Sequence, residues 1–299
     1  MKRDATLDGY ERHLTAQGLA KRTSDQYLDT ARRFLTHVGA RTRAQFTSAE
    51  YERYLVHRGR TISTQSVACE VYRLRPFFRA LVALDLAQTD PSTRLRPTLA
   101  EPGPPLVLSE AKVARIFAAA LRVPEHRGGR PVALRDRALL ELAYGLGLRV
   151  SELVAARLSD VDARAGAVLV RRAKNGGEQV LPLPPSALRR VLEYVHQGRP
   201  RLRQRGRGHD SGALLLNNRG GPISTQTATL YVRAIGKRAG VWFHSHALRR
   251  AVATHLTKRG VPLPAIQKLL GHSLLTTTQI YVAVAQEDLR STVALLERE

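Results

Sequence analysis

The sequence has little of what cross-linked, metal-bound or membrane-spanning proteins depend on. Among its 299 residues there is one cysteine, Cys69, which excludes an internal disulfide and a zinc site built from cysteines. No apolar run approaches the ~18 residues that a membrane-spanning helix needs. The first residues, Met1 to Asp4, lead into polar sequence without the apolar core of a signal peptide. We therefore expect a cytoplasmic protein that has no contact with a membrane.

Acidic residues are scarce relative to basic ones. The chain holds 25 Asp and Glu against 48 Lys and Arg, so its formal net charge is +23. Such a surplus favours a polyanionic partner, with nucleic acid as the first candidate. A GC-rich genome that encodes arginine freely would give a similar bias, so the composition permits DNA binding without proving it.

Proline and apolar residues divide the chain into two domains. Apolar residues make up 43% of the sequence, which is typical of a globular protein. A proline cluster with little apolar periodicity begins at Pro91 and ends at Pro105, and it predicts an interdomain linker over residues 93–105. Residues 1–92 are then one domain and residues 106–299 the other.

The first domain is predicted to be a bundle of four helices. Apolar residues recur at helical spacing throughout it. Pro76 lies within the fourth expected helix, residues 64–84, and predicts a kink or a break there. The polar faces are rich in Lys and Arg. Any one of these can be an ordinary solvated side chain, but together they suit a clamp on the phosphate backbone of DNA.

The second domain is predicted to be helical with one small β-sheet, so the whole fold is mainly α, of the α+β class. Two expected helices, residues 132–144 and 148–154, meet at a pair of glycines, and Arg149 lies at this joint. The structural alternative for Arg149 is that it caps the helix or pairs with Glu152, three residues on. Residues 199–208 alternate arginine with turn residues, and we expect them to form a loop near phosphate.

A β-hairpin is predicted in the middle of this domain. Residues 167–172 and 179–183 have the pattern of strands, and the Asn175-Gly176 pair between them is a strong signal for a tight turn. Lys174 would then stand at the tip of the hairpin. Considered alone, a lysine at such a position is an ordinary solvated turn residue.

The residues that carry chemistry gather between Ser245 and Tyr281. His246 and Arg249 are three residues apart on an expected helix, so they share a face. His272 follows a glycine at another expected helix end, and Tyr281 comes nine residues later. Singly, each has a structural interpretation as a core tyrosine, a hydrogen-bonded histidine or a paired arginine. The full set rarely occurs by accident.

A tyrosine with cations and imidazoles fits the attack of a phenol on a phosphodiester. Fixed cations stabilise the extra charge on the non-bridging oxygens, and a lysine or histidine can protonate the departing alkoxide. Metal-dependent phosphoryl transfer would need clustered carboxylates. The nearest pair, Asp160 and Asp162, is expected in a turn after a helix, with no histidine at ligand spacing. No metal and no other cofactor is therefore expected.

These motifs resemble those of the tyrosine recombinases, most closely the Xer-type and phage-integrase-like branch, over nearly the whole chain. Residues 18–23 look like part of that family's helical core-binding domain. The motifs of the second domain that carry the resemblance are Gly147-Leu148-Arg149-Val150-Ser151-Glu152-Leu153, Lys174 at the hairpin tip, His246-Ala247-Leu248-Arg249, Leu269-Leu270-Gly271-His272 and Thr277-Thr278-Gln279-Ile280-Tyr281.

The resemblance implies a role for each residue of a six-membered site. Arg149 and Arg249 would clamp the scissile phosphate. His246 would act as an acid/base or as a phosphate contact, and His272 would hold a phosphate oxygen. The two remaining members, a tyrosine and a lysine, would carry out bond formation and bond breakage.

Tyr281 would be the nucleophile that forms the 3′-phosphotyrosyl link, and Lys174 would give a proton to the leaving 5′ hydroxyl. The lysine hairpin departs from the family's common Gly-Lys-Gly-x-Lys-x-Arg pattern. Here residues 173–179 read Ala-Lys-Asn-Gly-Gly-Glu-Gln and lack the other basic members. Arg250 stands where histidine is frequent in the family.

The resemblance further implies a two-domain clamp on double-stranded DNA, located on the nucleoid. It would exchange strands without ATP or metal, as four protomers on two duplexes or together with a paralogous recombinase. The tail after Tyr281 is expected to dock on a neighbouring protomer, with packing on its own core as the alternative. Chromosome-dimer resolution and integration or excision of a mobile element both fit.

Two other functions stay open from the sequence. One is a type IB topoisomerase-like enzyme that nicks and reseals a single duplex with the same residues. The other is a catalytically inactive DNA-binding regulator, although the presence of all six site residues argues against it.

Overall fold

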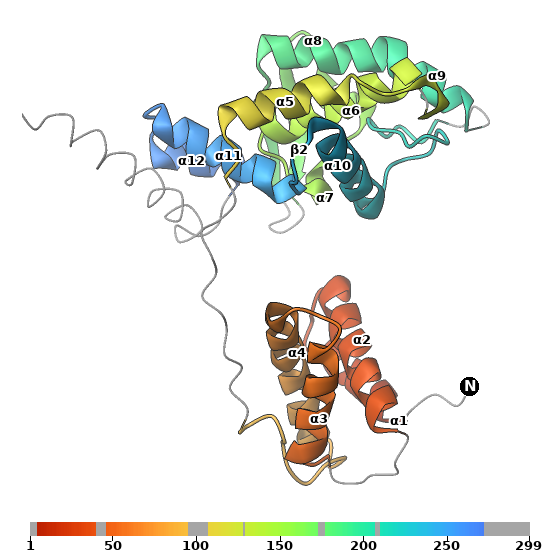
Figure 1. The fold of residues 1–299 in the computed structure, drawn as a ribbon, viewed down its shortest axis with the longest axis vertical. Helices are drawn as coiled ribbons and strands as arrows, with labels where there is room; N and C mark the ends of the chain where they lie inside the picture. The colour runs from red at the N-terminus through yellow and green to blue at the C-terminus, as the bar shows by residue number, and fades with distance from the viewer. Residues whose placement is uncertain are drawn as a thin grey trace, which may run out of the picture. The chain divides into compact units, whose positions relative to one another are not determined.

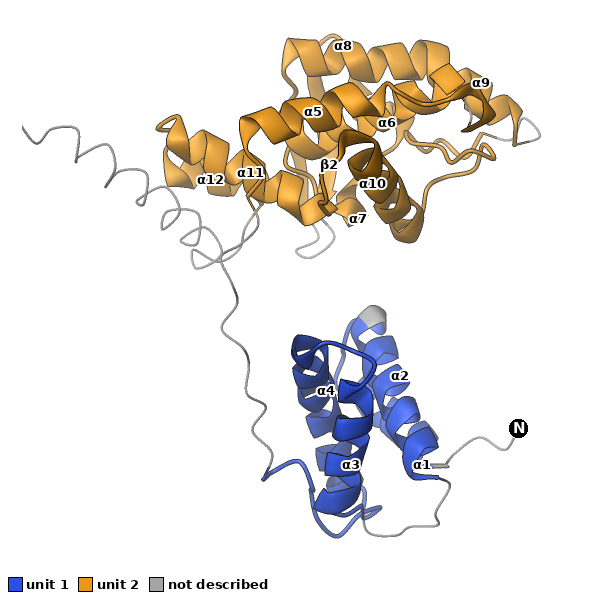
Figure 2. Ribbon diagram, viewed as in Figure 1, with its two compact units in different colours: residues 1–105 blue, residues 106–299 orange. Residues whose placement is uncertain are grey.

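The computed structural model describes residues 5–39, 46–94, 107–127, 129–172, 177–206 and 210–271. The chain divides into two compact units, residues 1–105 and residues 106–299 (Figure 2). Helices dominate the described part of both, and a small antiparallel sheet lies in the second unit, which confirms the expected mainly α fold class. No helix in the described ranges is both long and apolar enough to cross a membrane.

The first unit is a bundle of four helices around an aromatic core. Phe34 is fully buried, and its ring meets Tyr54 edge-on with the ring centroids 5.3 Å apart and Phe78 at 5.2 Å. Edge-to-face pairs of this kind add roughly 0.5–1.5 kcal/mol each to the gain from burial. The helices are α1 (Ala5–Ala16), α2 (Lys21–Val38), α3 (Ser48–Gly59) and α4 (Thr64–Ala83) (Figure 1).

Helix α4 continues through Pro76, so the alternative of a break at this residue is wrong. A proline in a helix interior costs about 3 kcal/mol. Leu74, Phe77 and Phe78 on either side are completely buried, and each such side chain gains roughly 1.5–3 kcal/mol on burial. The apolar face of α4 therefore outweighs the hydrogen bond that the proline removes.

The second unit is built around one buried helix, α6 (Gly129–Gly145), in which Leu139, Leu140 and Leu142 have no exposed surface. Helices α5, α8 and α11 pack against it (Figure 1). Short 3-10 turns lie at η1 (Glu125–Arg127) and η2 (Leu158–Asp160), and a π-helical turn, η3 (Tyr194–Gly198), follows α8. The other α-helices described in this unit are α5 (Glu110–Ala120), α7 (Val150–Ala155), α8 (Pro185–Glu193), α9 (Arg199–Gln204), α10 (Thr225–Ala239), α11 (Ser245–Lys258) and α12 (Leu263–Leu270).

The sheet has three antiparallel strands in the order β1 (Val161–Asp162), β2 (Ala167–Arg172), β3 (Gly177–Pro182). Strands β2 and β3 form the expected hairpin. Residues 173–176, which include its tip, lie outside the described residues. Strand β1 was not expected, because two residues are too few to show an alternating pattern.

The prediction of a loop over residues 199–208 is wrong for its first part, which forms α9. The helix forms there because its side chains contact residues outside it. Arg199 is 4% exposed, and its guanidinium donates to both carboxylate oxygens of Asp210 and to the carbonyl of Ala213. Leu202, between the alternating arginines, is completely buried in the core. Arg199 is thus a structural residue that pairs within its own domain.

Candidate active site

A glycine joint between α6 and α7 brings the chain against the end of α12. Gly147 has a φ of 59°, in the left-handed region that favours glycine. A Cβ atom at this position would lie 2.3 Å from the Cδ2 atom of Leu270, the last residue of α12. Only a residue without a side chain allows this turn and this close approach together.

Arg149, two residues further on, is oriented by the buried carboxylate of Glu152. One oxygen of Glu152 accepts a hydrogen bond from Arg149 Nη1 at 2.9 Å, and the other accepts from the backbone N–H of Arg149 at 2.8 Å. The Glu152 side chain is 1% exposed and the Arg149 side chain 27% exposed. Pairing with Glu152 was the structural alternative for Arg149, and here it holds a guanidinium that still reaches solvent. Arg149 Nη2 also donates to the carbonyl of Gly271 at 3.3 Å.

Arg249, in α11, reaches the same place from inside the protein. Its side chain is buried, and Nη1 donates to the carbonyl of Gly147 while Nη2 donates to the carbonyl of Leu270. A charge removed from water is costly unless dipoles or opposite charges surround it. These carbonyl oxygens supply that environment, and they tie the joint, α11 and α12 together. Both arginines therefore contact the C-terminal end of α12.

His246 lies one turn before Arg249 on α11 and remains open to solvent. Desolvation by the surrounding chain lowers its pKa, and the positive charge of Arg249 lowers it further, with Arg149 acting in the same direction. The imidazole is thus within electrostatic reach of both arginines. Since its ordinary pKa is about 6.5, the lowered value makes it neutral at pH 7.

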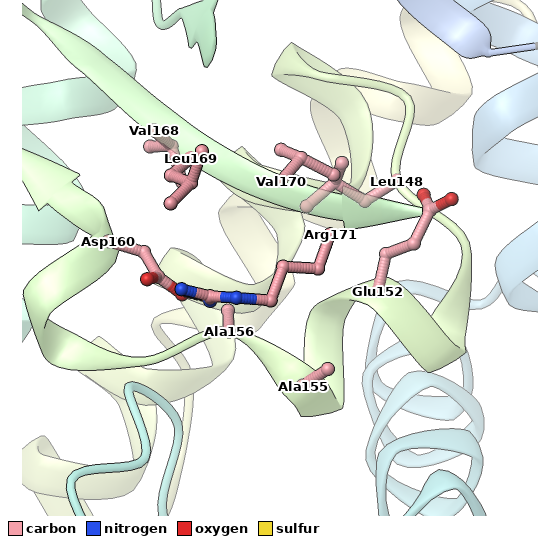
Figure 3. Close-up of a pocket in the computed structure, with 9 residues that line it drawn as sticks. All are labelled: Leu148, Glu152, Ala155, Ala156, Asp160, Val168, Leu169, Val170 and Arg171. Carbon is pink, nitrogen blue, oxygen red and sulfur yellow. Dashed lines mark hydrogen bonds and ion pairs between the residues drawn. The ribbon is translucent and has the colours of Figure 1, made fainter. Parts of the chain in front are cut away.

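The hairpin is held against this region at both strands. Arg171 of β2 forms an ion pair with Asp160 of η2, whose side chain is 1% exposed. Figure 3 shows the Arg171 guanidinium reaching Asp160 in the hollow between α7 and β2. On the other strand, the side-chain amide of Gln179 donates to the carbonyl of Lys268 in α12 at 3.1 Å. Strand β3 is therefore anchored beside α12, and strand β2 is anchored to η2.

The structure brings together the three candidate residues that it describes, Arg149, His246 and Arg249. Arg149 and Arg249 contact the last turn of α12 and the residue that follows it, and His246 lies within electrostatic reach of both arginines. In the sequence, His272 comes directly after Gly271, the carbonyl of which binds Arg149. The candidate residues that lie outside the described part of the chain are Lys174, His272 and Tyr281.

A buried histidine behind the site was missed in the sequence. His255 of α11 is 4% exposed, and its Nε2 bonds to the carbonyl of Leu108 at 2.9 Å, so Nε2 carries the proton. Nδ1 then accepts from the hydroxyl of Tyr144 at 2.8 Å. Burial lowers the pKa of His255 and raises that of Tyr144. His255 lies four residues after the buried Ala251, so the two residues share the apolar face of α11. A polar residue on this face was the sequence signal for a structural role.

Two oriented guanidiniums and a neutral, accessible imidazole can bind the non-bridging oxygens of a phosphodiester and exchange a proton beside it. Within the described residues no group of His, Cys, Asp and Glu could hold a metal ion. The chain also has a net charge of +23, which favours a polyanionic substrate. Together, the charge, the fold and the site define a class of enzymes that act on the phosphodiesters of nucleic acids.

Comparisons with known proteins narrow this class. Residues 107–288 match the phage integrase family, and residues 7–88 match the phage integrase N-terminal SAM-like domain. Tyrosine recombinase XerD of Mycobacterium tuberculosis is 34% identical over 298 residues, which covers 95% of this chain and 94% of that protein. Tyrosine recombinase XerA of Thermococcus kodakarensis is 33% identical, with coverages of 95% and 92%.

A solved structure supports the same fold. The lambda integrase tetramer bound to a Holliday junction aligns with a TM-score of 0.71 at 21% identity, covering 93% of this chain and 76% of that one. The chain therefore belongs to the phage integrase family, the tyrosine recombinases. It is a site-specific recombinase, an enzyme that breaks and rejoins DNA. The predicted family is confirmed, and neither the topoisomerase-like nor the inactive alternative is favoured.

Proposed function

We propose that this enzyme cuts each DNA strand through a covalent 3′-phosphotyrosyl bond at Tyr281 and rejoins it to a new partner. The observation that carries the proposal is the convergence on α12. Arg149, Arg249 and the strand beside the Lys174 turn all contact carbonyls between Lys268 and Gly271. The next residue in the sequence is His272, and Tyr281 follows nine residues later.

In the cleavage step the Tyr281 oxygen bonds to phosphorus and the bond from phosphorus to the 5′ oxygen breaks. Arg149 and Arg249 stabilise the charge that builds up on the non-bridging oxygens. Lys174 gives its proton to the departing 5′ oxygen, and His246 takes the phenol proton in those complexes in which its imidazole has stayed neutral. A 5′ hydroxyl of the partner strand then attacks the phosphotyrosine and releases Tyr281. The phosphotyrosyl bond conserves the energy of the phosphodiester, so neither ATP nor a metal is needed.

Residues 1–92 would be the core-binding domain that closes on the duplex, joined to the catalytic domain, residues 106–299, by the linker of residues 93–105. The basic faces of the helical bundle support this. Arg32 and Arg79 are exposed, with no ion-pair partner among the described residues, whereas Lys21 pairs with Asp25 in its own helix. Exposed, unneutralised arginines suit phosphate contacts.

The working assembly would be four protomers on two duplexes, or a mixed assembly with a paralogous recombinase. The lambda integrase relative is a tetramer on a Holliday junction, which supports this arrangement. The tail after Tyr281 would dock on a neighbouring protomer and couple the active sites. The outcome would be chromosome-dimer resolution or the integration or excision of a mobile element, and the protein would act in the cytoplasm, on the nucleoid.

The test is to trap the covalent intermediate. The full chain first selects its duplex site from a random-sequence library. That duplex is then nicked a few bases from the cleavage position, so that a short fragment diffuses away and religation is blocked. We expect a protein–DNA adduct that survives denaturing electrophoresis and needs no added metal.

A matched control separates the nucleophile from other tyrosines. Tyr281→Phe should bind the duplex and form no adduct. Tyr72→Phe removes the hydroxyl of an exposed tyrosine in the first unit and should form the adduct at the wild-type level. An adduct that persists in Tyr281→Phe, or a wild-type chain that binds and never forms one, contradicts the proposal.

A further inference from the structure

Trp242, the one tryptophan of the chain, stands out from the surface beside the site. Its side chain is 78% exposed, although tryptophan is one of the largest apolar residues. Its neighbours Val241 and Phe243 are 6% and 2% exposed. The short segment between α10 and α11 is therefore anchored on both sides of Trp242, and the alternation directs this ring outward. The exposure of Trp242 therefore follows from the burial of its two neighbours.

The ring borders a hollow with two basic residues. Arg233 and Lys237 of α10 line it together with Trp242. They are four residues apart, so they face the same way and repel each other by a few tenths of a kcal/mol. Both are exposed, and neither forms an ion pair with an acidic side chain in the described chain. An anion between them would remove the repulsion.

The floor of this hollow is fixed. A Cβ atom on Gly236 of α10 would lie 2.7 Å from the carbonyl oxygen of Val241 and 3.1 Å from the ring of Phe243. The helix and the segment that carries Trp242 are thus in close contact, which a larger residue would separate. We name the surface formed by Arg233, Lys237 and Trp242 the Trp242 groove.

The Trp242 groove is linked to the phosphate site through His244. The Trp242 ring meets His244 edge-on, with the ring centroids 5.9 Å apart. His244 in turn is close enough to His246 for its charge to affect that imidazole. Trp242 and His246 are four residues apart, so at most about 14 Å of chain separates them. Phosphates along one strand follow each other every few Å, so a strand that runs from His246 toward the groove would reach Trp242 within a few nucleotides.

We propose that the Trp242 groove is a second contact with the cleaved strand, in which Trp242 packs against the sugar or base of a nucleotide next to the scissile phosphate. Arg233 and Lys237 hold the flanking phosphates. An aromatic side chain and two cations form the pattern by which proteins grip nucleic acid without needing a specific sequence. Trp242 is a positioning residue here and takes no part in bond making. This inference rests on the proposed function.

The fluorescence of the chain tests it directly, because Trp242 is the one tryptophan. The probe is a duplex half-site, recovered by the full chain from a random-sequence library and long enough for one protomer. In the free protein, acrylamide should quench the emission readily. On the half-site the emission should become protected from acrylamide. Protection that develops only when a two-site duplex recruits a second protomer would show that another protein covers the ring, and would overturn the proposal.

Variants supply the second readout. Trp242→Ala should bind the half-site about tenfold more weakly, the effect of losing one aromatic contact with a nucleotide. Adduct formation at saturating protein should change by less than about threefold, as for a contact made equally before and during the reaction. Leu121→Ala, which removes another exposed apolar side chain of this unit outside the groove, should bind as the wild type does.

The possible results distinguish the groove from the recombinase mechanism. Adduct formation with unchanged quenching and unchanged affinity of Trp242→Ala overturns the groove proposal and leaves the mechanism standing. No binding and no adduct in the wild-type chain overturns both. The thermal midpoint of Trp242→Ala should equal that of the wild type, because so exposed a ring contributes little to the fold.

Discussion

Arg249 carries a positive charge in the interior, where 4% of its surface is exposed. Carbonyl oxygens on two segments accept from it, so the charge also holds the joint at Gly147 against α12. Arg149 is held differently, by an acidic partner three residues away. Arg249 is thus held by distant segments of the fold, whereas Arg149 is held by its own helix turn and also by the carbonyl of Gly271. Both charges lower the pKa of His246.

That lowered pKa predicts a proton uptake. A phosphate beside His246 favours the imidazolium, so binding raises the pKa that desolvation and Arg249 had lowered. At pH values between the pKa of His246 in the free protein and its higher pKa in the complex, DNA binding takes up a proton, so affinity should rise as the pH falls through that range. Fluorescence anisotropy of a labelled duplex at constant salt measures the affinity at each pH. His246→Asn should reduce the pH slope, and His13→Asn in the first unit should not. An unchanged slope in His246→Asn would contradict this.

The role of Lys174 as the general acid can be tested by changing the leaving group of the DNA. Lys174→Ala should slow cleavage of ordinary DNA by about 10²–10⁴-fold, because the departing 5′ oxygen loses its general acid. A duplex with sulfur at the bridging 5′ position should restore the rate, since a thiol with a pKa of about 8.5 leaves without a proton. Single-turnover gel assays provide the rates. Lys112→Ala, at an exposed lysine of α5, is the control. A defect that sulfur does not relieve assigns Lys174 another role.

At the scale of elements, local patterns predicted the helices and the hairpin, and they failed where distant residues decide. The apolar stripe of α11 and the Asn-Gly turn were visible in sequence. The burial of Arg199 was not, because its partner Asp210 lies beyond the helix that the pairing stabilises. The Arg149–Glu152 pair could be predicted from a spacing of three. The contact between Arg249 and Gly147 spans 102 positions and could not.

The joint at Gly147 gives a prediction at this scale. Gly147→Ala adds a methyl group that meets Leu270 and forces a left-handed φ on alanine, which costs roughly 1–2 kcal/mol before any clash. We expect a loss of at least about 2 kcal/mol in the free energy of unfolding, measured with urea. Gly177→Ala, with no heavy atom within 4 Å of its Cβ, should stay within about 0.5 kcal/mol of wild type.

A double-mutant cycle identifies the cause. Leu270→Ala alone should cost about 2–5 kcal/mol through the cavity it leaves. Combined with Gly147→Ala the loss should be smaller than the sum, because the leucine that meets the new methyl group is gone. Strict additivity would show that the two positions are not in contact in solution.

For the whole molecule, a surplus of +23 charges and two compact units suit an enzyme that holds a long polyanion. Both units match domains of one family, and the chain spans 94% of its Mycobacterium relative. Composition predicted the class of partner. The specific motifs were needed for the reaction, because a basic surplus alone does not distinguish a recombinase from other DNA-binding proteins.

Assembly can be separated from cleavage by shortening the tail. A chain that ends at Tyr281 should bind a half-site as the wild type does but fail to form the four-protomer complex on two duplexes. Gel shift and mass photometry give the two measurements. The milder triple change of Leu289, Val293 and Leu296 to alanine, in the apolar stripe of the tail, should weaken assembly in the same direction. Unchanged assembly of the shortened chain would contradict docking between protomers.

The most direct test of the mechanism is to identify the residue that becomes linked to DNA. The trapped adduct is digested with nuclease and trypsin, and the peptide that carries a phosphodeoxynucleotide is sequenced by mass spectrometry. We expect the peptide of residues 269–290, in which Tyr281 is the one tyrosine, with the added mass on that residue. A modified serine or histidine, or a different tyrosine, would contradict the proposal that this enzyme works through a Tyr281 phosphotyrosyl bond.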